Sequence, residues 1–150
     1  MLEAIENAKE ELKRADHLMY VSLKYTRTVD VLRSILERLI NSFDFLIDAL
    51  LKAKKVKDIP KIPKLKAEAV KKAYLDDQQM STFMDFYLLL RSVDRASFER
   101  ALEYRRHVTM TAHLDDKEIE IDIDIIENYF NKVKDFVALV ENLVGANEHE

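Results

Sequence analysis

Residues 29–53, VDVLRSILERLINSFDFLIDALLKA, decide the fold of this chain and contain neither glycine nor proline. Their large apolar side chains recur at steps of three and four, the spacing that places residues on one face of an α-helix. The apolar positions are Val29, Leu32, Leu36, Leu39, Phe43, Leu46 and Leu50, with Ile35, Ile40, Ile47 and Leu51 widening the stripe. Because so little of this helix is polar, we predict that it is the central helix of a bundle on which other helices pack.

Length and composition favour the same fold class. A chain of 150 residues is the size of one domain, so we predict a single helical-bundle domain over residues 1–150, with a proline-containing linker at residues 58–63. One glycine and two prolines leave few tight turns for a sandwich or a barrel. The predicted fold is mainly α, an up-and-down bundle of five to six helices.

The residue types also limit the location and the chemistry. The chain has no cysteine, which excludes disulfides, thiol catalysis and cysteine-based metal sites. No stretch reaches the roughly 20 consecutive apolar residues of a membrane span. We therefore expect no membrane partner and a cytoplasmic location, and the charged fraction of 35%, rich in lysine and glutamate, is typical of a thermophile protein.

Periodicity and capping residues predict the remaining helices. We expect helices over residues 2–24, 65–75 and 98–107, another capped by Asp76 or Asp77, and a last one from Asp122 or Asp124 to Gly145. A break over residues 25–31 precedes the central helix, with Thr28 or Asp30 as its cap, and residues 147–150 form a frayed tail. The expected core includes Leu36, Leu39, Phe43, Leu46, Phe136 and Val140.

The stretch of residues 108–123 has a different period. Apolar and polar residues alternate before and after Asp115-Asp116-Lys117, which predicts a small β-hairpin lying on a helical face. The alternative is that the helix over residues 98–107 continues through this stretch.

Charge is distributed unevenly along the chain. Residues 52–72 contain nine lysines, whereas residues 115–127 contain seven acidic residues. These stretches are either solvated surface, or they meet each other or a partner.

The segment from Arg91 to His107 contains the best candidate site, because it holds five of the nine arginines of the chain. Arginine suits forked recognition of phosphate or carboxylate. In a helix, Arg100 and His107 would share one face, with Glu103 and Tyr104 between them and Arg105 as a neighbour. Glu103 would pair with Arg100 or hold His107; the alternative is an exposed ladder of ion pairs.

The same segment resembles the HEPN superfamily, in which an arginine precedes a histidine by a few residues, late in a small helical bundle. Arg100-Ala101-Leu102-Glu103-Tyr104-Arg105-Arg106-His107 matches that spacing, and Ala15-Asp16-His17-Leu18 matches a segment of the first helical hairpin. The resemblance covers roughly residues 2–107. It implies a metal-independent ribonuclease that acts as a dimer, with Arg100 holding the scissile phosphate and His107 transferring a proton. Members of the family often have a polar residue directly after the arginine, where this chain has Ala101.

Two classes of function follow. The first is a non-enzymatic helical module, a homodimer that binds RNA or a protein; the alternative is the HEPN-type ribonuclease using Arg100 and His107. We expect self-association because the central and last helices have more apolar circumference than a monomer of this size covers. No residue cluster in the sequence calls for a metal or cofactor, so we assign none.

Overall fold

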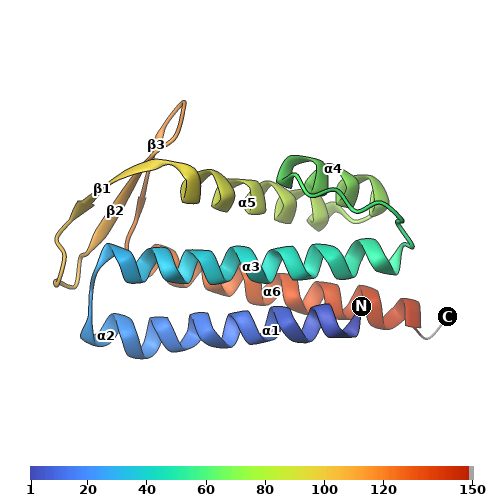
Figure 1. Ribbon diagram of the computed structural model, residues 1–150, viewed down its shortest axis with the longest axis horizontal. Coiled ribbons are helices and arrows are strands. Elements are labelled where there is room, and N and C mark those ends of the chain that lie inside the picture. Colours follow the sequence, from blue (N-terminus) through green and yellow to red (C-terminus); the bar gives the residue numbers. More distant parts are fainter. Residues whose placement is uncertain (149–150) are drawn as a thin grey trace.

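The computed structural model describes residues 1–148. Helix α1 (Leu2–His17) continues through a π-helical turn (Leu18–Ser22) into the short α2 (Leu23–Tyr25). The other elements are α3 (Val29–Ala53), α4 (Pro63–Ala73), α5 (Gln78–Arg95), β1 (Ser97–Ala101), β2 (Thr109–His113), β3 (Glu118–Ile121) and α6 (Ile123–Glu148). Figure 1 shows the long helices running side by side, with the three strands at one end of the molecule. The mainly α fold predicted from the sequence is therefore confirmed.

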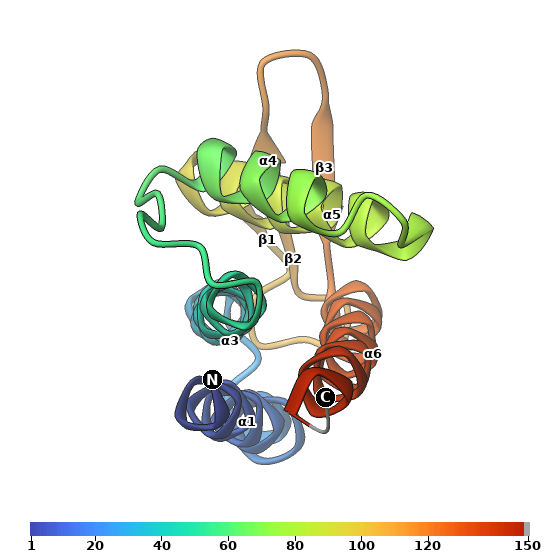
Figure 2. The same cartoon turned by 90° about the vertical axis from the view of Figure 1, so that its right-hand side faces the viewer.

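Helix α3 occupies the centre of the bundle, as its wide apolar stripe predicts. It contacts α1, α4, α5 and α6. Viewed along the bundle, α1, α3 and α6 form a triangle, and α5 crosses above α3 and α6 (Figure 2). Because other helices surround α3, every large apolar side chain predicted for its core face can leave water.

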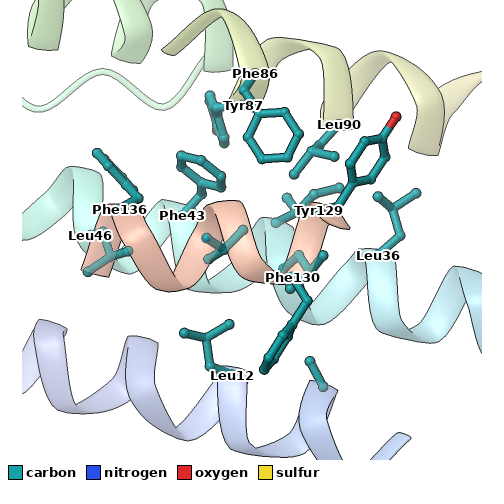
Figure 3. Packing of buried hydrophobic residues seen from close by; sticks show 14 of the residues in the cluster. Leu12, Leu36, Phe43, Leu46, Phe86, Tyr87, Leu90, Tyr129, Phe130 and Phe136 are labelled. Atoms are coloured by element: carbon teal, nitrogen blue, oxygen red, sulfur yellow. The ribbon is translucent and has the colours of Figure 1, made fainter. Parts of the chain in front are cut away.

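The buried side chains confirm the expected core. Phe43 is 0% exposed, and its ring lies 4.8 Å from that of Phe136 in α6, 5.5 Å from Tyr87 and 5.8 Å from Phe86 in α5, measured between centroids (Figure 3). The other predicted core residues are buried as well: Leu36, Leu39, Leu46, Phe136 and Val140. Stacked and edge-on aromatic pairs add to the hydrophobic contribution of their buried area, so Phe43 joins three helices.

Polar contacts join α3 to the helices above it. Asp44 of α3 accepts a hydrogen bond of 2.6 Å from the hydroxyl of Tyr87 and pairs with Arg91, both in α5. Lys66 of α4 approaches the same carboxylate at 3.3 Å. Burial, and then Asp44 itself, raise the pKa of Tyr87 well above its ordinary value. Asp44 therefore fixes the positions of α4 and α5 relative to α3.

Two of the predicted helix starts are confirmed by their caps. The Thr28 hydroxyl accepts a hydrogen bond from the Val31 amide at 3.3 Å, and Asp77 accepts one from the Gln79 amide at 2.9 Å. The third helix begins two residues before its expected start: Pro63, expected in the linker, is the first residue of α4, where a helix does not need an amide proton.

The predicted end of the last helix is wrong. Helix α6 begins at Ile123, and Asp122 accepts a hydrogen bond from the Ile125 amide at 2.8 Å, but the helix passes through Gly145 and continues to Glu148. Glycine inside a helix costs only about 1 kcal/mol, so it does not have to end one. Of the expected tail, residues 147 and 148 are helical, and residues 149–150 lie outside the described part of the chain.

The hairpin prediction is confirmed, whereas the helix expected over residues 98–107 is wrong. Strands β1, β2 and β3 form an antiparallel sheet in that order, with Arg100 opposite Met110 and Met110 opposite Ile121. An isolated two-stranded hairpin is marginal, and a third strand stabilises it. Residues 97–101 pair with the free edge of β2 across the β1–β2 loop, and this pairing overrides their helical periodicity.

Helices α3 and α6 do not expose the apolar surface from which self-association was predicted. Self-association itself stays a prediction. None of the exposed large apolar side chains in the described residues belongs to α3, and Ile125 is the only one in α6 up to Gly145. The other helices already cover the apolar surface that was expected to seek a partner. Within residues 1–148, no helix is both long and apolar enough to cross a membrane.

The lysine-rich and acidic stretches do not pair with each other. Lys66 pairs with Asp44, and Lys71 pairs with Asp85 at 2.7 Å. The ammonium group of Lys54 lies 4.9 Å from the centre of the Tyr74 ring. Among the ion pairs of the described residues, none joins residues 52–72 to residues 115–127.

Candidate functional site

The structure separates the residues that the sequence placed on one helix face. Arg100 lies in β1, whereas Glu103, Tyr104, Arg105 and His107 lie in the loop between β1 and β2. The expected face of Arg, Glu, Tyr and His therefore does not exist. Its helical spacing holds only while the backbone is helical, and the chain leaves that conformation once residues 97–101 join the sheet.

Arg100 connects β1 to the start of α3. Its Nη2 atom lies 2.9 Å from Oδ1 of Asp30, and its Nη1 atom lies 3.8 Å from Oε1 of Glu103. The hydrogen bond to Asp30 raises the pKa of the Arg100 guanidinium above its ordinary value. Of the two partners considered for Glu103, the structure therefore selects Arg100.

Glu103 also caps α3 from outside the helix. Its Oε2 atom accepts a hydrogen bond of 3.3 Å from the amide of Val29, the first residue of α3. The first amides of a helix have no partner within it, and a carboxylate is favoured at this positive end. The β1–β2 loop is thus docked on the N-terminal end of the central helix.

The loop takes an unusual backbone conformation that turns side chains outward. Leu102 and Tyr104 have φ angles of 56° and 65°, in the left-handed region that costs a residue with a side chain about 1–2 kcal/mol. A hydrogen bond of 2.6 Å from the Tyr104 amide to the carbonyl of Arg27 opposes this cost. Strained backbone that tertiary contacts maintain is characteristic of functional segments.

This hydrogen bond brings two basic, aromatic segments together. The first is Lys24-Tyr25-Thr26-Arg27, at the end of α2, and the second is Tyr104-Arg105-Arg106-His107. They meet at the end of the molecule where α2 and the β1–β2 loop lie in Figure 1. Their cationic and aromatic residues form what we call the Tyr–Arg surface: Lys24, Tyr25, Arg27, Tyr104, Arg105 and Arg106.

The two tyrosines of this surface are unusually accessible. Tyr25 is 78% exposed and Tyr104 is 77% exposed, although large aromatic side chains normally bury most of their area. Lys24, Arg105 and Arg106 are exposed beside them. Several nearby acids are already engaged: Asp30 binds Arg100, Glu103 caps α3, and Glu127 accepts a hydrogen bond from the Tyr20 hydroxyl.

A hollow adjoins the Tyr–Arg surface where the β1–β2 loop meets the start of α6. Its volume is about 230 Å³, and its lining residues are Arg27, Arg106, His107, Asp122, Ile123 and Asp124. The Nε atom of Arg27 is buried and has no hydrogen-bond partner within the described residues. Arg100 does not line this hollow, so the two residues of the sequence motif lie in different environments.

The chemistry of this end suits a ligand that carries both phosphates and flat rings. Guanidinium groups bind phosphate oxygens through paired hydrogen bonds, and exposed aromatic rings stack on nucleobases. The sequence predicts Tyr104 and Arg105 as neighbours of the site, whereas it predicts residues 25–31 only as a helix break. A tyrosine close to two basic residues occurs in both segments, and this is the signal that could have indicated Tyr25 and Arg27.

Comparison with known proteins adds no further guide to this site. No family model, curated protein or solved structure matches the chain.

Proposed function

We propose that this protein is a non-enzymatic module that binds single-stranded RNA through the Tyr–Arg surface. The observation that carries the proposal is the meeting of two basic, aromatic segments through the hydrogen bond from Tyr104 to Arg27. The two segments carry two exposed tyrosine rings, three exposed cations and the partly buried Arg27. Proteins that bind single strands combine these two elements: cations that follow the backbone and aromatic side chains on which bases stack.

The lysine-rich residues 52–72 are the less suitable surface. Three of their nine lysines are engaged within the protein, with Asp44, with Asp85 and over the Tyr74 ring. The large apolar side chains exposed in this stretch, Ile62 and Leu65, are aliphatic and offer no face on which a base could stack. These lysines would add a general attraction for polyanions without positioning a base.

The positions of Arg100 and His107 support RNA binding better than RNA cleavage by these two residues. A HEPN-type reaction needs Arg100 and His107 to act on the same phosphate. In a single chain, the guanidinium of Arg100 is held by Asp30, and His107 faces a hollow that Arg100 does not line. We therefore propose a structural role for Arg100, in holding the β1–β2 loop on α3.

Fluorescence anisotropy with a labelled single-stranded RNA tests the proposal. The variants Tyr25→Ala and Tyr104→Ala should each weaken binding about 5- to 150-fold, because stacking on an aromatic side chain contributes about 1–3 kcal/mol per base. The main-chain bond from residue 104 to Arg27 is retained in the alanine variant, so the loop should keep its position.

Leu75→Ala is the matched control. Leu75 is 78% exposed, as Tyr25 is, but it lies between α4 and α5, away from the β1–β2 loop (Figure 1). Its replacement should leave the affinity unchanged. Undetectable binding by the parent protein at low salt, or tyrosine variants that bind as well as Leu75→Ala, would refute the proposal.

A further inference from the structure

The hollow beside the Tyr–Arg surface has an unusual arrangement of charge. Arg27 and Arg106 line it together with Asp122 and Asp124. Within residues 1–148, no ion pair joins these four side chains to each other, although they surround the same space. Because these arginines and aspartates line one hollow without pairing, a ligand that carries both an anionic group and a hydrogen-bond donor could contact both kinds of side chain.

Arg27 adds a second, independent observation. Its side chain is partly buried, and its Nε atom is closed off from solvent with no acceptor in the described residues. Leaving a buried donor unpaired is costly, and such groups in native proteins normally have a partner. Arg27 also lines the hollow, so its side chain is placed to meet a ligand oxygen there.

The carboxylates of Asp122 and Asp124 differ in whether they already accept a hydrogen bond. Asp122 already accepts a hydrogen bond from the Ile125 amide at the start of α6. Asp124 is exposed, and no hydrogen bond or ion pair from the described residues occupies its carboxylate. Asp124 is therefore the better acceptor for a hydroxyl group of a ligand.

We propose that the hollow binds one ribose phosphate of the RNA strand and distinguishes RNA from DNA. Arg27 and Arg106 donate hydrogen bonds to the phosphate, and Asp124 accepts one from the 2′-hydroxyl of the ribose. The inference rests on the proposed function and adds selectivity for the sugar. DNA lacks that hydroxyl. In a complex with DNA, the Asp124 carboxylate would therefore lie near the negative phosphate without a hydrogen-bond donor, and this disfavours the binding of DNA.

The volume of the hollow suits one ribose with one phosphate. A space of about 230 Å³ is far larger than the roughly 30 Å³ that one water molecule occupies in the liquid. It is smaller than the sites of about 300–1,000 Å³ that enclose drug-sized ligands. A sugar with one phosphate fits between these limits, while the bases would remain outside on Tyr25 and Tyr104.

Competition between two oligonucleotides tests the inference on the full chain. The probes are one single-stranded RNA and the 2′-deoxy oligonucleotide with the same bases. The parent protein should bind RNA about 10-fold or more tightly, as expected for one hydrogen bond to a charged group. In Asp124→Ala the two affinities should become nearly equal, whereas Arg106→Gln should weaken both and leave their ratio close to that of the parent.

Asp116→Ala provides the matched control, because it removes the same charge from an exposed position in the β2–β3 turn. It should preserve the RNA preference. Equal binding of both probes by the parent, or an unchanged preference in Asp124→Ala, would overturn the inference while leaving RNA binding intact. If neither probe binds, the proposed function fails as well. Circular dichroism of Asp124→Ala confirms that a lost preference does not come from lost folding.

Discussion

Replacing Arg105 and Arg106 together by glutamine is expected to lower the salt dependence of RNA binding by about a third. The Tyr–Arg surface has four cations, Lys24, Arg27, Arg105 and Arg106. Arg27 and Arg106 share one phosphate in the hollow, so the four cations neutralise three phosphates if Lys24 and Arg105 contact one each. The logarithm of the binding constant then falls against the logarithm of salt concentration with a slope of about −2.1, from about −0.7 per phosphate on a single strand. The double variant retains two contacts, so its slope should be about −1.4.

These slopes translate into a clear difference in a titration. Between 50 and 200 mM salt, the parent protein should lose about 18-fold in affinity and the double variant about 7-fold. Anisotropy titrations at four or more salt concentrations measure both slopes. Both arginines are exposed, so thermal stability should change little.

The matched control removes two positive charges elsewhere. Lys57→Gln with Lys61→Gln changes the net charge equally, but it does so in the lysine-rich stretch of residues 52–72. This control should lower the affinity for RNA modestly, and its slope of binding against salt concentration should stay close to that of the parent protein. If this control changed the slope as much as the arginine variant did, the binding surface would lie on the lysine-rich stretch and our reasoning would be wrong.

Three other predictions concern the core, cleavage and assembly. Phe43→Ala should reduce the free energy of unfolding by about 3–5 kcal/mol, measured by chemical denaturation, whereas Phe45→Ala, on the same helix but partly exposed, should cost clearly less. As a binding module, the protein should leave single-stranded RNA intact in EDTA; cleavage that disappears in both Arg100→Ala and His107→Ala would establish the ribonuclease instead. The sequence also predicts self-association, and light scattering that gave the monomer mass of 17.6 kDa throughout the micromolar range would contradict it.

Local signals made the helical framework predictable. The caps Thr28 and Asp77 act within a few residues of chain, so the sequence alone indicates where those helices begin. The stripe on α3 predicted its central place, because only surrounding helices can bury so much apolar surface. Gly145 was misleading, since its freedom permits a helix end without requiring one.

Apart from the helix wrongly expected over residues 98–107, the sequence by itself thus determined the helices, the core residues and the hairpin around Asp115 and Asp116, all of which depend on spacing over short distances. Only the tertiary structure decided the site. Residues 97–101 have a pattern compatible with a helix, and they became β1 because β2 offered an edge to pair with. That pairing separated Arg100 from His107 and placed Tyr104 against Arg27, a contact between distant segments that no local pattern encodes.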